Sequence, residues 1–167
     1  MLKVAIMLDN DEIFKENTIF GGNIDIDKLR PRLKQAQIHY VKYLFCDNLY
    51  NKLYNDFING ELEGTYLYIY ENFFAYLLMY KAAELYATNG AYTIDNKGIS
   101  KIQADNAVSI DYSEISILKQ DCYILYDNVR EEWFRWLRSN ILTIDEQYRP
   151  TCIECNYRMK KIGTFIV

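Results

Sequence analysis

Cys152 and Cys155 are the residues whose spacing most resembles a metal site. Two thiolates separated by two residues can supply two of the four ligands that a structural zinc ion requires. The sequence has no second pair of this kind, and Cys46, Cys122 and the only histidine, His39, lie in segments with helical periodicity. We therefore expect all four cysteines to be thiols, with zinc binding by Cys152 and Cys155 as the alternative.

The side chains needed for acid–base or nucleophilic catalysis form no recognisable set. His39 has no serine or cysteine nucleophile in a suitable setting, and Asp25 and Asp27 occupy the positions of helix caps. Gly21 and Gly22 precede those caps without the rest of a phosphate-binding loop. The sequence therefore predicts a protein that is not an enzyme and needs no cofactor. The opposing hypothesis is an enzyme with zinc at the cysteine pair.

Composition favours a folded protein that uses aromatic contacts. Half of the residues are apolar and a quarter are charged, which is the balance of a globular domain. The net charge of −4 lacks the positive field of sequence-specific DNA-binding proteins. The 16 tyrosines offer large contact areas with a polar tip, as subunit interfaces do. The longest aromatic run, residues 66–80, contains Glu71, and no secretory signal is present, so we expect a soluble protein made in the cytoplasm.

Four helices are predicted from caps and from apolar residues three or four positions apart. The first follows a cap at Asp25 or Asp27 and runs to about Cys46, where a bend leads into a second, shorter helix. The third covers residues 65–89, and the fourth, rich in aromatic residues, covers residues 111–140. At the rise of an α-helix the fourth is roughly 45 Å long. We therefore expect it to project from its domain or to bend.

Two segments fall outside this helical pattern. Residues 91–103 combine β-prone stretches with an Asp-Asn-Lys-Gly turn, which predicts a β-hairpin or an extended arm. Residues 142–167 carry Pro150 and no helical period, which predicts an extended tail. We expect a mainly α fold, a bundle of about four helices, in a domain of residues 1–141 with the arm inserted and the tail at its end.

Strand edges and aromatic side chains predict where another subunit binds. A two-stranded arm is barely stable alone, so we expect its edge to pair with a neighbour. The tail, which ends in the sequence TFIV, can do the same. The predicted interface residues are Tyr92, Ile94, Ile99 and Ile102 in the arm, Tyr68 and Tyr76 in the third helix, and Phe165 and Ile166 in the tail.

Four segments follow one another in an order that carries a resemblance. A helical pair (IDIDKLRPRLKQAQIHYVKYLFCDNLYNKL) is followed by a long helix (YIYENFFAYLLMYKAAELYA), a turn-rich segment (NGAYTIDNKGISKIQADNAVSID) and an aromatic helix (YILYDNVREEWFRWLRSN). This order, over residues 22–141, resembles the small head-to-tail connector proteins of tailed bacteriophages, also called adaptor or neck ring proteins, especially those of crAss-like phages.

The resemblance implies a structural virion protein without chemistry of its own. Connector subunits assemble as a ring, commonly twelvefold, beneath the portal protein, and packaged DNA passes through the centre. The implied partners are further copies of the chain, the portal protein and other neck or tail proteins, with neither sequence-specific DNA binding nor a membrane. The alternative is a non-enzymatic helical binding or regulatory protein, monomeric or dimeric, that holds a partner with its tyrosine-rich surface.

Overall fold

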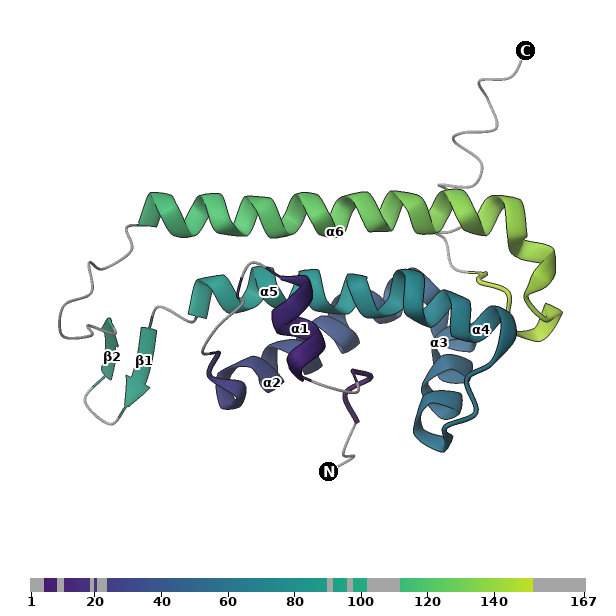
Figure 1. Cartoon of the computed structure of the whole chain (residues 1–167), viewed down its shortest axis with the longest axis horizontal. Helices are drawn as coiled ribbons and strands as arrows, with labels where there is room; N and C mark the ends of the chain where they lie inside the picture. Colours follow the sequence, from purple (N-terminus) through teal and green to yellow (C-terminus); the bar gives the residue numbers. More distant parts are fainter. Residues whose placement is uncertain are drawn as a thin grey trace, which may run out of the picture.

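A mainly helical bundle is confirmed by the computed structural model (Figure 1). The structure describes residues 5–8, 11–18, 20, 24–89, 92–95, 98–101 and 112–151, with 92–95 and 98–101 described by their backbone alone. Along the chain the elements are α1 (Asp11–Asn17), α2 (Ile26–Ala36), the π-helical turn η1 (Gln37–Val41), α3 (Lys42–Asn59), α4 (Gly64–Ile69), the π-helical turn η2 (Tyr70–Phe74), α5 (Ala75–Asn89), β1 (Tyr92–Asp95), β2 (Gly98–Lys101), α6 (Tyr112–Asn140) and the 3-10 turns η3 (Ile141–Thr143) and η4 (Glu146–Tyr148).

The predicted bend between the first two helices is a break inside α3. Asp25 caps α2, and its side chain accepts a hydrogen bond from the backbone N–H of Asp27 at 3.1 Å. Helical geometry continues through η1 into α3 until Cys46, whose backbone leaves the helical region with φ 58° and ψ 165°. After the break, α3 ends at Gly60, which adopts the left-handed conformation with φ 70°. The bend at Cys46 is therefore confirmed.

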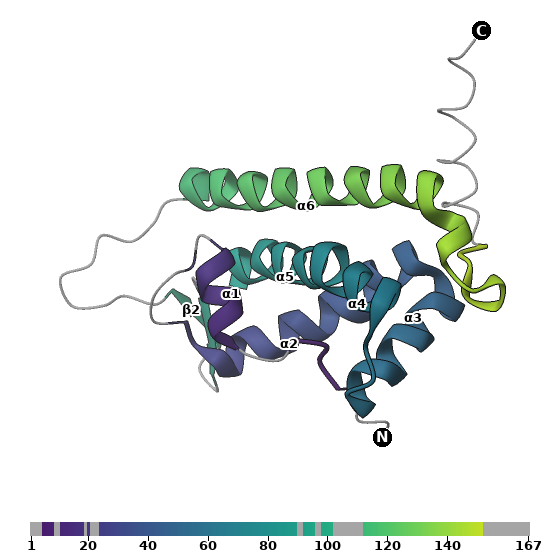
Figure 2. The ribbon, with the colours of Figure 1, turned by 45° about the vertical axis from the view of Figure 1, so that its right-hand side comes forward.

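The long helix α6 lies against a helical rod of similar length. α4, η2 and α5 continue one another, and α6 runs antiparallel along them, while α2 packs on another side of α5 (Figures 1 and 2). The inward face of α6 buries Cys122, Tyr126, Trp133 and Leu137. The expectation that this helix projects or bends is wrong, because the rod gives it a partner along its length.

Aromatic rings from three elements form the centre of the core. Trp133 of α6 is fully buried and stacks on Phe45 of α3, with ring centroids 4.6 Å apart. Phe45 also contacts Phe74 of η2 at 5.2 Å. The indole N–H of Trp133 donates a hydrogen bond to the carbonyl oxygen of Leu44 at 3.1 Å. This bond fixes α6 next to the break in α3.

Residues 142–151 depart from the predicted extended tail. They include most of η3 and all of η4, and Ile144 is buried in the core. Arg149 Nε donates hydrogen bonds to the carbonyl oxygens of Ile141 at 3.2 Å and of Ile144 at 3.1 Å. These tertiary contacts fold the segment back, and no periodic pattern in the sequence announces them. The rest of the predicted tail, residues 152–167, lies outside the described residues.

The predicted arm contains two short strands. β1 and β2 pair antiparallel, with Tyr92 opposite Lys101 and Ile94 opposite Ile99. They lie beyond the end of α5 (Figure 1). The contact of this arm with a neighbouring subunit stays a prediction.

Candidate subunit interface

Stacked aromatic rings lead from the core to the surface beside α4. Trp136 stacks on Trp133 with ring centroids 5.7 Å apart, and it also stacks on Tyr68 of α4 at 5.7 Å. Trp133 is fully buried, whereas Tyr68 is 45% exposed. Packed rings therefore hold Tyr68 in place at the surface, as rigid anchors of interfaces are held.

The surface around Tyr68 is concave, with a volume of about 380 Å³. We call this site the aromatic hollow, and its lining residues are Tyr68, Asn72, Phe73, Glu132, Arg135, Trp136, Ser139 and Asn140. Glu132 and Arg135 are exposed and give the hollow both charges, while the rings supply apolar surface. Aromatic residues and arginine are the types enriched in the binding hot spots of protein interfaces.

The other half of α6 carries exposed aliphatic side chains. Ile117 is 59% exposed, Ile124 is 47% exposed and Leu125 is 37% exposed. Ile117 and Ile124 are seven residues apart and lie on one line of the helix surface, with Leu125 beside it. We call these three residues the outer ridge. Large contiguous apolar patches mark interaction sites on protein surfaces, so we take the outer ridge as a second candidate contact surface.

A mostly buried ion pair holds the half of α6 that carries the outer ridge. The ammonium of Lys81 lies 2.8 Å from the carboxylate of Glu84, and both residues belong to α5. The same ammonium lies 4.2 Å from the ring centre of Tyr40 in η1 and 5.3 Å from that of Tyr126 in α6. One cation therefore joins three elements through its charge and its contact with two aromatic faces.

The cysteines of the described residues differ in their state. Burial, with the charges of Glu84 and Asp121 nearby, raises the pKa of the Cys122 thiol to about 11, so it is a poor nucleophile at neutral pH. Cys122 is a free thiol as predicted, whereas Cys46 is disulfide-bonded. The expectation of a thiol is therefore wrong for Cys46, because spacing along the sequence does not reveal which cysteines meet in the fold.

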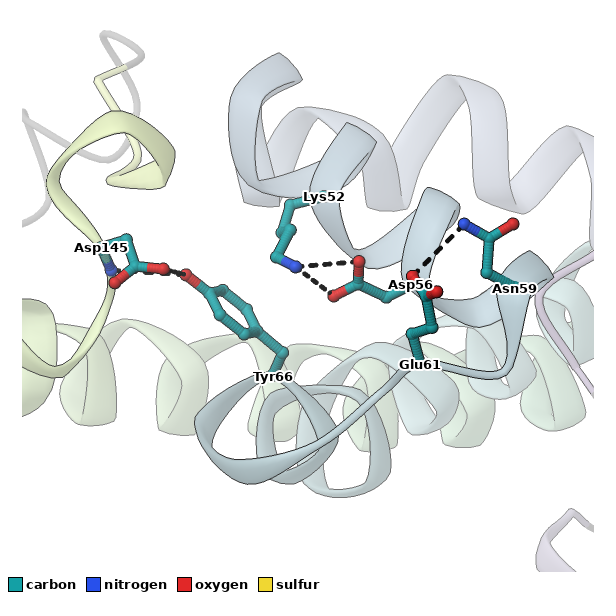
Figure 3. A network of polar contacts seen from close by, with 6 residues as sticks. All are labelled: Lys52, Asp56, Asn59, Glu61, Tyr66 and Asp145. Carbon is teal, nitrogen blue, oxygen red and sulfur yellow. Dashed lines mark hydrogen bonds and ion pairs between the residues drawn. The ribbon is translucent and has the colours of Figure 1, made fainter.

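Polar contacts fix α4, which carries Tyr68, to α3 and to the segment after α6. The hydroxyl of Tyr66 donates a hydrogen bond to the carboxylate of Asp145 at 2.8 Å (Figure 3). Lys52 pairs with Asp56 at 2.7 Å, and its ammonium lies 5.0 Å from the centre of the Tyr66 ring. Burial and the neighbouring Asp145 raise the pKa of Tyr66 to about 12. These contacts fix the direction in which α4 presents Tyr68.

Replacing Tyr66 by phenylalanine should flatten the dependence of stability on alkaline pH. The pKa of Tyr66 rises from 10.0 in the unfolded chain to about 12 in the native protein. The contribution of its hydroxyl is therefore complete below pH 10 and is lost as the pH rises to about 12, because only the unfolded chain releases the proton in that window. Urea titrations at a series of pH values should show a smaller loss of unfolding free energy for Tyr66→Phe. Tyr123→Phe, which changes an exposed tyrosine, should follow the wild-type curve. A Tyr66→Phe curve parallel to the wild type contradicts the assignment.

The predicted interface residues lie in different settings in the structure. Tyr68 lies in the aromatic hollow, whereas Tyr76 is half-buried on α5, where its ring centre lies 6.0 Å from that of Tyr80. The strands that are described by their backbone alone contain Tyr92, Ile94 and Ile99. Outside the described residues lie Ile102, Phe165, Ile166 and the cysteine pair Cys152 and Cys155.

The outer ridge and Trp136 are candidate interface residues that the sequence prediction did not include. The spacing of seven between Ile117 and Ile124 is a signal for a shared face. The spacing identifies an exposed face only when the inward face of α6 is known, because the sequence alone does not tell which of two apolar stripes on a long helix is buried. Tyrosine content alone directs attention to α4 and α5 instead.

A larger hollow, of about 620 Å³, lies over the break in α3 and is lined in part by His39, Lys42 and Cys46. Lys42 pairs with Asp47 at 2.9 Å. The sulfur of Cys46 is held in a disulfide, so it is no nucleophile for the imidazole to activate. Among the residues that the structure describes, no three His, Cys, Asp or Glu side chains gather as a metal site would require. Within the same part of the chain, every helix is too short or too polar to cross a lipid bilayer.

Comparison with curated proteins found no match, and comparison with solved structures found none either. A family model described as a family of unknown function, DUF6712, matches residues 11–155. This range contains every helix of the described residues, the aromatic hollow and the outer ridge. Because the match spans most of the sequence, the chain belongs to the DUF6712 family, whose function is unknown.

Proposed function

We propose that the protein is a structural subunit of a phage virion that forms a closed ring of about twelve copies in the head-to-tail connector, beneath the portal protein. The observation that carries this proposal is the presence of two exposed surfaces of different shape on one long helix. The aromatic hollow lies at one end of α6 and the outer ridge lies toward the other. The order of the sequence segments, which resembles that of connector proteins, supports the same function.

A ring of identical copies requires two different surfaces that fit each other. The outer ridge offers protruding aliphatic side chains, and the aromatic hollow offers a concave aromatic site. Leu125 and Arg135 are ten residues apart, which corresponds to roughly 15 Å along a helix. Surfaces so far apart on one straight helix do not meet within a subunit, so a contact between the ridge and the hollow must join two copies.

The remaining partners follow from the arm and from the charge. The strands β1 and β2 offer backbone edges that the portal protein or another neck or tail protein can extend. The net charge of −4 suits a channel through which packaged DNA moves without being held. In this function the protein is not an enzyme and binds no cofactor.

Native mass spectrometry of the protein, alone and mixed with the portal protein of the same phage, tests the proposal. We expect a closed oligomer of about twelve copies, formed alone or on the portal. A monomer or dimer that is indifferent to the portal contradicts the ring. That outcome favours the second candidate, a non-enzymatic helical binding or regulatory protein, which is supported by the exposed Tyr43 and Tyr123.

Replacing Ile124 by aspartate should weaken ring formation and leave the fold intact. The side chain is 47% exposed in the single subunit, so the change costs little there, whereas in the ring it places a charge in an apolar contact. We expect the protein concentration at half-assembly to rise by about tenfold or more, which corresponds to about 1.4 kcal/mol per contact. Mass photometry over a dilution series measures this midpoint.

The matched control is Ile58→Asp, which changes an isoleucine that is 52% exposed on α3, outside both surfaces. Its midpoint should equal that of the wild type. Equal effects of Ile124→Asp and Ile58→Asp contradict a specific role for the outer ridge, while circular dichroism of both variants checks that the helices are intact.

A further inference from the structure

Residues 5–8 are held against η1 and α3 by side chains. The fully buried amide of Gln37 accepts a hydrogen bond from the backbone N–H of Met7 at 2.8 Å and donates one to the carbonyl oxygen of Ala5 at 3.0 Å. The backbone N–H of Ala5 donates a hydrogen bond to the hydroxyl of Tyr54 at 3.0 Å. We call residues 5–8 the strap, and we call Gln37 and Tyr54, with the pocket that encloses Met7, the strap site.

The strap site recognises the backbone of its occupant and one side chain. The N–H and C=O groups of one residue and the N–H two residues later are the groups that an extended chain presents along one edge. Gln37 and Tyr54 therefore take the place of an adjacent β-strand. Met7 is fully buried in the core, so the site also selects an apolar side chain at that position.

The strap site needs an occupant. The amide nitrogen of Gln37 also donates a hydrogen bond to the hydroxyl of Tyr50 at 2.9 Å. The structure gives the buried side chain of Gln37 three hydrogen bonds, and without the strap only the one to Tyr50 would remain. The pocket that encloses Met7 would become an empty cavity. Both changes cost free energy, because a buried polar group without partners and an unfilled cavity destabilise a fold.

The occupant can come from another copy of the chain. The hydrogen bonds described above join residues 5–8 to η1 and α3 through the side chains of Gln37 and Tyr54. α1 has only seven residues, too few to be stable alone, so side-chain contacts such as that of buried Phe14 hold it in place. A neighbouring copy offers the same contacts, and an exchange of identical segments therefore loses none of them.

We propose that in the assembled ring each copy exchanges residues 5–8 together with α1, so that each strap site is filled by residues 5–8 of a neighbouring copy. The proposal rests on the proposed ring, because a neighbour must lie within reach. The strap and the strap site are different surfaces of one subunit, so their exchange is head-to-tail and closes in the same way as the ring. It adds a second contact to that between the outer ridge and the aromatic hollow.

Photo-cross-linking in isotope-mixed assemblies tests the exchange. Benzoylphenylalanine replaces Ile6, a partly buried residue of the strap, in the full-length chain. Equal amounts of ¹⁵N-labelled and unlabelled protein are mixed in denaturant, refolded, assembled and irradiated. Mass spectrometry then sorts the peptides cross-linked to η1 or α3 by the isotope of each half. Exchange predicts that about half of these pairs combine the two isotopes, because a neighbour carries either label at random. Pairs of a single isotope only would overturn the proposal.

Two controls make the outcome specific. The same probe at Leu62, between α3 and α4, should give only single-isotope pairs, because that loop stays with its own chain. Gln37→Met keeps a side chain of similar length but removes the amide, and it should lower the yield of mixed pairs by about fivefold or more. An unchanged yield would show that the amide does not recognise the strap.

Native mass spectrometry of the same samples separates this proposal from the proposed function. If a ring forms and all cross-linked pairs carry a single isotope, the proposed ring stands and the exchange of the strap is overturned. Mixed pairs in a dimer support exchange between copies and overturn the ring. A monomer with single-isotope pairs overturns both.

Discussion

Trp133→Ala should lower the free energy of unfolding by about 3–5 kcal/mol. The indole is fully buried and stacks on Phe45 at 4.6 Å, so its removal leaves a cavity between α3 and α6. The change also removes the hydrogen bond from the indole N–H to the carbonyl oxygen of Leu44. Stabilities of single domains are commonly about 5–15 kcal/mol, so this variant loses a large share of its total. Urea denaturation followed by far-UV circular dichroism measures the loss.

Two further variants show whether burial and the hydrogen bond produce this effect. Trp133→Phe keeps an aromatic ring but loses the hydrogen bond and part of the volume, so we expect a loss of about 1–3 kcal/mol. Trp136→Ala removes an indole that is only half-buried, and it should cost less than Trp133→Ala. Equal losses for the two alanine variants contradict the central place of Trp133 in the core.

The helices were predictable because local signals and tertiary packing agree. The fourth predicted helix, residues 111–140, corresponds to α6, since its inward stripe is strongly apolar and aromatic. The bend at Cys46 was predictable because the next residue, Asp47, can cap a second helix. The partner of α6 was not predictable from its length, because the packing of α4, η2 and α5 alongside it depends on residues that are distant in sequence.

Other features depend on contacts that no local pattern encodes. Gln37 would be assigned to a solvated helix face, yet it is fully buried because its amide bonds the backbone of residues 5 and 7, some thirty positions away. No local sequence pattern announces the π-helical turn η1, which begins at Gln37. α1 is too short for its single buried aromatic residue, Phe14, to produce a periodic pattern.

The candidate interface was predictable only in part. Tyrosine enrichment led to Tyr68, which the structure places in the aromatic hollow. The same criterion also selected Tyr76, which is half-buried against its own subunit. Residue type alone does not separate a tyrosine that packs in the core from one that meets a partner. The outer ridge is identified by the reverse observation, aliphatic side chains that the fold leaves exposed.

Glu84→Gln should lower the free energy of unfolding by about 3 kcal/mol, because it leaves the ammonium of Lys81 mostly buried without its carboxylate partner. The rings of Tyr40 and Tyr126 still face that ammonium and compensate for a part of the lost charge pair, which places the effect at the lower end of the range for buried pairs. Urea denaturation measures the change. Adding Lys81→Met to the variant should restore at least about 1 kcal/mol, because the unpaired cation is then replaced by an apolar side chain of similar length.

The matched control for this substitution is Glu12→Gln, which breaks another pair three residues apart, Lys15 and Glu12, in which the carboxylate is mostly exposed. We expect a loss below about 0.5 kcal/mol there. The two variants should also differ in their effect on assembly, because Lys81 joins α5 to η1 and to the half of α6 that carries the outer ridge. Glu84→Gln should therefore weaken ring formation even where most subunits are folded, whereas Glu12→Gln should not. Similar losses for the two variants, or a double variant less stable than Glu84→Gln alone, would mean that the cation is well solvated and that other contacts place the ridge.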